Sequence, residues 1–259
     1  MTSLQIGLIL PDVLGTYGDD GNALVLRQRA RMRGLEAEIV PIKLGEAVPD
    51  SLDVYTVGGG EDTAQILAAE HLIADGGLTR AASAGTPVLA ICAGLQVLGE
   101  SFRASGRVVD GVGLIDATTA SMAERAIGEV ASTPTQAGIT AELTEPLTGF
   151  ENHMGATILG PAAKPLGTLT RGTGNADTAA TYDLSDATAQ RAAEGAVQGS
   201  VIATYMHGPV LARNPQLADL LLAKATGVAL SELEPLDIPA VERLRTERFA
   251  ASEPPRSQR

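Results

Sequence analysis

The sequence predicts an α/β protein with an open, mostly parallel twisted sheet, helices on both faces and some antiparallel strands. Up to Phe102, short apolar runs alternate with helical patterns. That alternation is typical of βαβ units, whose strands pair in parallel. After Phe102, the apolar runs are separated by segments rich in glycine and threonine, which favours shorter and more antiparallel strands.

The first 84 residues contain three candidate strands and three candidate helices. Strands are expected where apolar runs are short, at residues 4–10, 36–40 and 52–57. Helices are expected where apolar residues recur at helical spacing, at residues 22–34, 62–74 and 78–84. The first helix carries four arginines that are expected on a solvent-exposed face: Arg27, Arg29, Arg31 and Arg33.

Cys92 stands between a candidate strand at residues 87–91 and a helical pattern that runs to Phe102. Ala90 precedes Cys92 by two positions and Gly94 follows it by two, so the backbone can make the sharp turn of a nucleophile elbow. At the start of a helix, unpaired N–H groups favour the thiolate, which is the nucleophilic form of cysteine. The alternative is a small buried hydrophobic residue.

After Phe102, the sequence predicts short strands, one long polar segment and two helices. Candidate strands lie at residues 116–119, 125–131, 140–143, 157–159, 166–170 and 196–205. Residues 172–186 are expected to form a long hairpin or loop. A helix is expected from Pro215 to residue 226, with Asn214 as its N-cap. A charged helix is expected at residues 239–250, followed by a disordered tail at residues 252–259.

The composition excludes several classes of function. With 44% hydrophobic residues in a chain of 259, a sizeable core can form. The formal net charge of −12 disfavours binding to a nucleic-acid backbone or to an anionic membrane surface. No apolar run reaches the roughly 20 residues needed to span a bilayer, and the N-terminus lacks the basic region of a signal peptide. We therefore expect a cytoplasmic protein with no nucleic-acid partner and no stable membrane insertion.

His207 is a candidate base for Cys92. It follows an apolar run that ends at Tyr205, so it is expected at the end of a strand, on the same edge as Cys92 if the two strands are parallel. A cysteine nucleophile needs a nearby base that holds the thiolate and later protonates the leaving group. The alternative is a structural histidine. His153 is expected on a loop, and no metal site is expected because no partner stands at ligand spacing.

A run of three glycines, residues 58–60, follows the strand expected at residues 52–57. Glycines at such a place allow close approach of the backbone to a ligand, with N–H groups directed at a developing negative charge. The alternative is a flexible turn. The pattern G-x-G-x-x-G is not matched, so a dinucleotide site is not supported.

The segment Pro-Val-Leu-Ala-Ile-Cys-Ala-Gly-Leu-Gln, residues 87–96, resembles the nucleophile segment of class I glutamine amidotransferases. The resemblance is to the cobyric-acid-synthase-like branch and, within it, to the GatD glutaminase subunits of MurT/GatD lipid II isoglutaminyl synthases. It implies a flavodoxin-like fold. Further matching motifs occur in order along most of the chain: Tyr17-Gly-Asp-Asp-Gly-Asn22, Leu26-Arg-Gln-Arg-Ala30, Gly58-Gly-Gly-Glu-Asp62 with Gln65, residues 111–116, Phe150-Glu-Asn-His153 and Tyr205-Met-His-Gly-Pro209.

The resemblance implies roles for individual residues. Cys92 would attack the side-chain amide of glutamine, and His207 would act as general base and acid. Arg125 matches the family arginine that holds the substrate glutamine, and a guanidinium suits an α-carboxylate; its alternative role is a surface ion pair. The oxyanion hole is expected to consist of backbone N–H groups of three residues: Gly59, Gly60 and Ala93.

One position departs from the wider class. Most class I amidotransferases carry a glutamate two residues after the histidine, whereas this chain has Pro209 there. No local carboxylate therefore orients His207. The sequence leaves three unranked candidates for that role: Asp19, Glu61 and Glu151.

The resemblance also implies a partner. Ammonia would pass to a MurT-like synthetase of the Mur-ligase family in a heterodimer, with ATP and Mg²⁺ on that partner and no cofactor in this chain. The partner would amidate the D-glutamate α-carboxyl of lipid II. Alternatives are a corrinoid or another small carboxylate as acceptor, or a non-catalytic binding subunit. The amidotransferase domain is expected at residues 1–229, with a C-terminal helix and flexible tail at residues 230–259.

Overall fold

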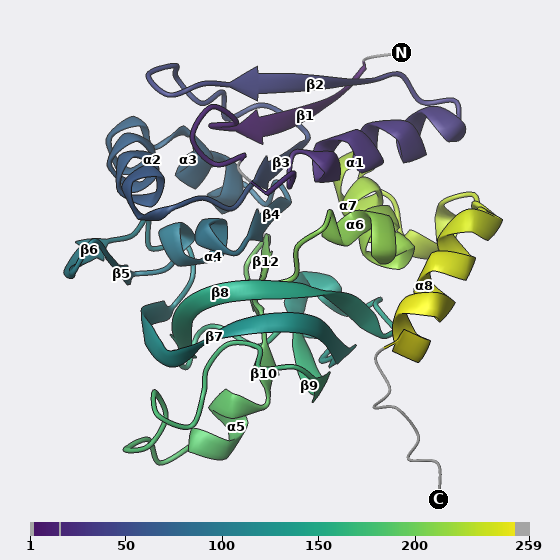
Figure 1. Cartoon of the computed structure of the whole chain (residues 1–259). Coiled ribbons are helices and arrows are strands. Elements are labelled where there is room, and N and C mark those ends of the chain that lie inside the picture. Colours follow the sequence, from purple (N-terminus) through teal and green to yellow (C-terminus); the bar gives the residue numbers. More distant parts are fainter. Residues whose placement is uncertain (1–2, 16, 252–259) are drawn as a thin grey trace, which may run out of the picture.

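Two sheets organise the chain in the computed structural model, which describes residues 3–15 and 17–251. The first sheet is mostly parallel and has helices on both faces, and the second is mostly antiparallel (Figure 1). This architecture confirms the predicted fold class. The expected tail at residues 252–259 lies outside the described residues.

The first sheet has the strand order β11-β12-β4-β3-β1-β2. Every neighbouring pair is parallel except β11 and β12. Parallel order brings the carboxyl ends of four adjacent strands, β12, β4, β3 and β1, to one edge. The strands are β1 (Leu4–Ile9), β2 (Ala37–Ile42), β3 (Val54–Val57), β4 (Val88–Ile91), β11 (Ala196–Gln198) and β12 (Val201–Thr204).

Six helices cover the two faces of this sheet (Figure 1). The strands β3, β4 and β12 are buried at every position, as expected for strands that are covered on both faces. One face carries α1 (Gly21–Met32), α6 (Val210–Arg213) and α7 (Pro215–Thr226), and the other carries α2 (Asp62–Asp75), α3 (Gly77–Ser83) and α4 (Ala93–Leu98).

The second sheet has the order β10-β9-β7-β5-β6, with β8 paired antiparallel to β7. Its strands are β5 (Ser101–Ala104), β6 (Arg107–Asp110), β7 (Ala117–Pro134), β8 (Leu147–Leu159), β9 (Gly167–Arg171) and β10 (Ala193–Glu194). The remaining elements are η1 (Gly138–Thr140), α5 (Ala187–Arg191), η2 (Leu230–Glu232) and α8 (Pro239–Ala251).

Two of the expected short strands are parts of one long strand. Residues 116–119 and 125–131 both fall largely within β7, whose pairing with β8 shifts register between Ser121 and Ala126. A β-bulge adds residues to one strand and breaks the alternation of apolar and polar positions. The sequence pattern therefore stops and restarts although the strand continues.

Three expected elements are wrong. The helix after Cys92 ends at Leu98 because Gly99 is extended (ψ −175°), and Phe102 belongs to β5. The strand expected at residues 196–205 is a hairpin of β11 and β12, which turns at Gly199 (φ +56°). Residues 140–143 form no strand, and the 3₁₀ helix η1 ends at Thr140.

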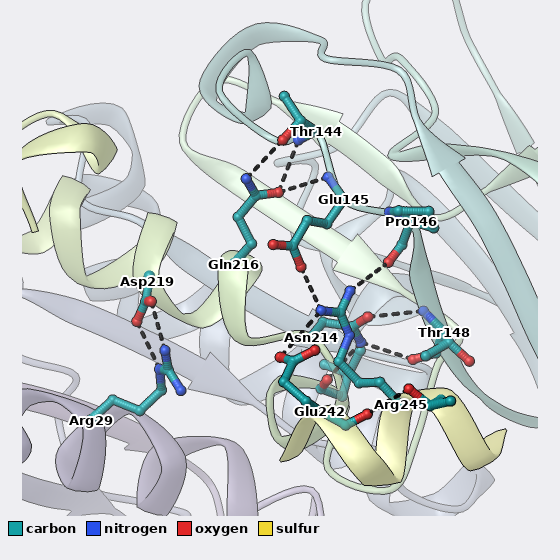
Figure 2. Close-up of polar contacts among 12 residues, drawn as sticks. Arg29, Thr144, Glu145, Pro146, Thr148, Asn214, Gln216, Asp219, Glu242 and Arg245 are labelled. Carbon is teal, nitrogen blue, oxygen red and sulfur yellow. Dashed lines mark hydrogen bonds and ion pairs between the residues drawn. The ribbon is translucent and has the colours of Figure 1, made fainter. Parts of the chain in front are cut away.

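Two of the four arginines expected on an exposed helix face have buried side chains: Arg29 within α1 and Arg33 at its C-cap. Arg29 donates to both carboxylate oxygens of Asp219 on α7, at 2.7 and 2.6 Å (Figure 2), and Arg33 also approaches Asp219 Oδ2 at 2.9 Å. The side chains of Arg29 and Arg33 are 6% and 4% exposed. These contacts join α1 to α7 on the same face of the sheet.

A second polar cluster joins β8 and the segment that precedes it to α7 and α8 (Figure 2). Asn214 accepts from the Thr148 N–H and donates to the Thr148 carbonyl, at 2.9 and 2.8 Å. On α8, Arg245 pairs with Glu145 at 2.6 Å. The cluster anchors the second sheet to the helical layer.

In the described residues, none of the helices has the length and apolarity needed to cross a membrane.

The Asp219→Ala variant should lose about 3–5 kcal/mol of unfolding free energy, because it leaves two buried guanidinium groups without their carboxylate. Urea denaturation followed by circular dichroism measures the loss. Asp50→Ala is the matched control, because the ion pair of Asp50 with Arg80 is exposed (48% and 59%). This substitution should cause no measurable change in stability. Equal effects of the two substitutions would contradict a role for burial.

Candidate active site

Cys92 occupies a strained turn between β4 and α4. Its backbone has φ +51° and ψ −101°, a region that residues with a Cβ rarely adopt. The Cys92 N–H donates to the Thr204 carbonyl of the adjacent strand β12 at 2.8 Å, which fixes the turn. The residue is 7% exposed and lines a cavity. The predicted elbow geometry is confirmed.

Two glycines next to the elbow are required for packing. A Cβ on Gly58 would stand 1.9 Å from the Leu14 carbonyl oxygen, and one on Gly94 would stand 3.0 Å from the Val57 carbonyl oxygen. Only glycine fits at Gly58 without moving backbone. The loop after β3 can therefore lie directly beside the turn that carries Cys92.

His207 lies at the end of β12, beside Cys92. Strands β12 and β4 are parallel neighbours, with Thr204 opposite Ile91, so the residues that follow both strands emerge at one edge. The His207 N–H donates to the Phe150 carbonyl of β8 at 2.9 Å, which anchors the backbone. The predicted common edge of Cys92 and His207 is therefore confirmed.

Asp19 is the carboxylate that contacts His207. Nδ1 of His207 lies 3.3 and 3.2 Å from the two carboxylate oxygens of Asp19, and a carboxylate accepts, so Nδ1 carries the proton. Of the other two candidates, Glu61 accepts from the Tyr17 hydroxyl, and Glu151 accepts from backbone N–H groups at residues 173 and 174. The structure thus selects Asp19 among the three candidates.

The environment of His207 favours its charged form. Burial acts against the charge, but the hydrogen bond to Asp19 and the nearby Cys92 together raise the pKa of His207 from 6.5 to about 10. An imidazolium beside a thiol stabilises the thiolate. Within the described residues, Nε2 forms no hydrogen bond of good geometry. Cys92 nevertheless lies close enough to His207 to raise its pKa.

The three expected oxyanion donors differ in their contacts. The Gly59 N–H donates to Asp19 Oδ2 at 3.0 Å, so it serves the carboxylate rather than a substrate oxygen. Within the described residues, the N–H groups of Gly60 and Ala93 have no hydrogen-bond acceptor. In this conformation, Gly59 is therefore not available as an oxyanion donor, whereas Gly60 and Ala93 are.

A cavity of about 340 Å³ opens in front of Cys92. Arg125 lines it from the irregular part of β7, where a bulge redirects side chains, and donates to Asn152 Oδ1 at 3.2 Å. Gln96 and Glu61 also line the cavity. The arrangement offers a nucleophile and a cation around one space that fits a small molecule, with His207 beside the nucleophile.

The expected loop at His153 is wrong, because this residue lies within β8. Its ring stacks on Tyr205, with centroids 3.6 Å apart, and Nδ1 lies 3.0 Å from the Gly155 carbonyl oxygen. Burial lowers the pKa of His153 to about 3, so the ring is neutral. No cluster of three or more His, Cys, Asp or Glu that could hold a metal ion occurs among the described residues.

Tyr17 is a residue of the site that the sequence did not single out. Its ring lies 5.3 Å from that of His207, and its hydroxyl donates to Glu61. The hydrogen bond to Glu61, followed by burial, raises the pKa of Tyr17 to about 12. Its position in the loop after the first strand, two residues before Asp19, was the available signal.

Known proteins similar to this chain are glutamine amidotransferases. Residues 5–215 match the family described as the CobB/CobQ-like glutamine amidotransferase domain. The chain is 33% identical over 241 residues to the lipid II isoglutaminyl synthase (glutamine-hydrolyzing) subunit GatD of Staphylococcus aureus, covering 92% of this chain and 90% of that protein. It is 30% identical to the subunit of the same name from Streptococcus pneumoniae, covering 95% and 89%.

More distant relatives share parts of the chain or the fold. A cobyric acid synthase of Sphingopyxis alaskensis is 29% identical over 74% of this chain, which spans 35% of that protein. A crystal structure of a glutamine amidotransferase superposes with a TM-score of 0.53 at 19% identity, over 85% of this chain and 98% of that one. The glutaminase domain of Trypanosoma brucei CTPS superposes with a TM-score of 0.50 at 12% identity, over 88% and 95%.

The Asp19→Asn variant should lower the pKa of His207, because the carboxylate that stabilises the imidazolium becomes neutral. NMR titration of the His207 ring measures the change. Because the folded-state pKa is raised, the stabilisation is fully present below pH 6.5 and is lost as pH rises towards about 10. The stability advantage of the wild type over Asp19→Asn should therefore shrink across that window.

Asp12→Asn is the control for this prediction, because the Asp12 carboxylate accepts from the Leu44 N–H and contacts no histidine in the described residues. An unchanged His207 titration in Asp19→Asn would show that Asp19 does not set the charge of the ring.

Proposed function

The chain belongs to the CobB/CobQ-like glutamine amidotransferase family, and from that membership we propose that it is the glutamine-hydrolysing subunit of a lipid II isoglutaminyl synthase. The observation that carries the chemistry is the arrangement of Cys92, His207 and Asp19 at the edge of one parallel sheet, with Cys92 on the wall of a cavity that Arg125 also lines. Two relatives with that name, each matched over most of its length, support the assignment of the complex.

The first half of the reaction forms a thioester. The Cys92 thiolate attacks the side-chain amide carbon of L-glutamine, and the carbonyl oxygen becomes an oxyanion that accepts hydrogen bonds from the N–H groups of Gly60 and Ala93. As the carbonyl re-forms, the C–N bond breaks and the nitrogen takes the proton from Nε2 of His207. Ammonia leaves, and a γ-glutamyl group remains on the sulfur.

The second half of the reaction returns the enzyme to its starting state. A water molecule loses a proton to Nε2 of His207 as its oxygen attacks the thioester carbon. The C–S bond then breaks, which releases glutamate and the Cys92 thiolate beside the protonated ring. Asp19 keeps Nδ1–H directed at itself throughout, so that Nε2 is always the nitrogen that faces the reacting atoms.

Arg125 would bind the α-carboxylate of the substrate. Among the residues that the structure describes, its guanidinium makes one hydrogen bond, to Asn152, which leaves donors for a carboxylate. Its location on the wall of the cavity that contains Cys92 supports this role. A guanidinium recognises a planar carboxylate through paired hydrogen bonds.

The ammonia would pass to a MurT-like synthetase of the Mur-ligase family, which would form a heterodimer with this chain and hold ATP and Mg²⁺. The names of the two GatD relatives describe each as a subunit, which supports a second chain. This chain carries no G-x-x-x-x-G-K-[ST] motif for its own ATP site. The acceptor would be the D-glutamate α-carboxyl of lipid II, and the cytoplasm is the expected location.

The similarity to cobyric acid synthases favours one second candidate, a glutaminase that serves a corrinoid or another small carboxylate. The chemistry at Cys92 would be the same and only the partner would differ. The match covers 35% of that larger synthase.

Cys92→Ser should reduce ammonia release from L-glutamine by at least about a thousandfold, because a serine at this position lacks the reactive thiolate. An enzyme-coupled ammonia assay, run on the chain alone and with its synthetase partner, measures the effect. Circular dichroism checks that the variant is folded. Full activity in a folded Cys92→Ser protein would refute the proposed chemistry.

Addition of a MurT-like synthetase and ATP should increase ammonia production by the wild-type chain and transfer the nitrogen to lipid II. The transfer is followed with ¹⁵N-amide glutamine and mass spectrometry of the lipid. The Cys92→Ser chain in the same mixture is the control. Nitrogen transfer with a corrinoid synthetase, and none with the Mur-ligase-like protein, would favour the second candidate.

A further inference from the structure

Opposite charges line the cavity in front of Cys92. Arg125 comes from β7 in the second sheet, and Glu61 comes from the loop between β3 and α2 in the first. The cavity thus has two cations, Arg125 and Arg103 of β5, on walls from the second sheet, and Glu61 on a wall from the first. An α-amino acid carries one carboxylate and one ammonium group, so its two charges match Arg125 and Glu61.

Glu61 is not neutralised by a cation. Its carboxylate accepts a hydrogen bond from the Tyr17 hydroxyl, and no ion pair of Glu61 is formed among the described residues. The neighbouring Asp62 also lines the cavity, but its Oδ2 accepts from the Ser105 N–H at 2.5 Å. Each acid accepts from a neutral donor, and Glu61 is the one whose donor, Tyr17, also lies against His207.

Tyr17 holds Glu61 close to the reacting groups. The tyrosine ring lies against His207, with centroids 5.3 Å apart, while its hydroxyl contacts Glu61. Cys92 and Arg125 are both near enough to act electrostatically on Tyr17. Tyr17 therefore lies among four functional side chains: His207, Cys92, Glu61 and Arg125.

We infer that Glu61 binds the α-ammonium group of the substrate, opposite Arg125, and that Tyr17 is a positioning residue that keeps the Glu61 carboxylate in place. This inference rests on the proposed function of the chain as a glutaminase. It assigns three attachment points to L-glutamine: its side-chain amide at Cys92, its carboxylate at Arg125 and its ammonium at Glu61.

Three attachment points select a substrate by its functional groups and by its chirality. A D-amino acid that places its amide and carboxylate correctly would direct its ammonium away from Glu61. An amide without an ammonium group would lose the ion pair with Glu61 and would therefore bind less well. Glu61 would therefore select L-glutamine over otherwise similar amides.

The test compares two reagents that alkylate Cys92. 6-Diazo-5-oxo-L-norleucine has the α-ammonium and α-carboxylate of glutamine; its diazo carbon takes a proton, the thiolate sulfur bonds to that carbon, and N₂ leaves. Iodoacetamide has neither charged group; the sulfur displaces iodide. Mass spectrometry gives the rate constant for each reagent, and their ratio reports recognition of the amino acid independently of thiol reactivity.

Glu61→Gln should lower this ratio by about 10- to 100-fold, the range expected for loss of a hydrogen bond between two charged groups. The side chain of Glu61 makes no capping bond to α2, although the residue is the N-cap, so the helix should be retained. Tyr17→Phe, which keeps the ring against His207, should lower the ratio less, and the double variant should be no worse than Glu61→Gln. Glu70→Gln, on the exposed part of α2, is the control for loss of one negative charge and should leave the ratio unchanged.

The outcomes separate the inference from the proposed function. If the diazo reagent labels wild-type Cys92 no faster than iodoacetamide does, the glutaminase proposal fails. If the wild type shows the preference and Glu61→Gln keeps it, the assignment of Glu61 is overturned while the glutaminase proposal stands. An equal loss of the ratio in Glu70→Gln would also overturn it, because a general change in charge would then explain the effect.

Discussion

The hydrogen bond from the Cys92 N–H to the Thr204 carbonyl joins the two strands on which the site depends. It continues the parallel pairing of β4 with β12 by one residue, so the chain that turns at Cys92 and the chain that leads to His207 leave the sheet side by side. Strands β3 and β1 pair in the same direction on the other side of β4. The loops that follow β3 and β1 supply the glycine run and Asp19. Four consecutive strands of the sheet therefore position Cys92, His207, Asp19 and the glycine run.

Close packing within those loops explains why small residues are needed there. A Cβ on Gly59 would lie 2.9 Å from Asp19 Oδ2 and 3.1 Å from His207 Cε1. The Gly59 N–H meanwhile donates to Asp19. The backbone of Gly59 therefore holds Asp19, and Asp19 in turn orients His207. A larger side chain at Gly59 would displace this backbone. The strained backbone at Cys92 is held by the hydrogen bond from its N–H to the Thr204 carbonyl.

Most of the parallel sheet, and the common edge of Cys92 and His207, could be predicted because apolar runs and glycine turns are local signals. The carboxylate partner of His207 could not be ranked, since the conformation of a turn-rich loop decides it. The bulge in β7 concealed a long strand, and polar neighbours concealed that His153 is buried in β8. The burial of Arg29 was missed because Asp219, which pairs with it, is distant in sequence. Each of these failures concerns a contact between distant residues, which spacing along the chain does not encode.

The proposed function requires that Cys92 forms a covalent bond to the glutamyl group while His207 transfers the protons. The most direct measurement is to capture that group with hydroxylamine during turnover of L-glutamine by the complex with its synthetase subunit. The account predicts that γ-glutamyl hydroxamate forms as ammonia is released, and that acid-quenched protein carries a glutamyl group on Cys92. Release of ammonia with no hydroxamate and with Cys92 unmodified would mean that water attacks glutamine directly, and would contradict the account.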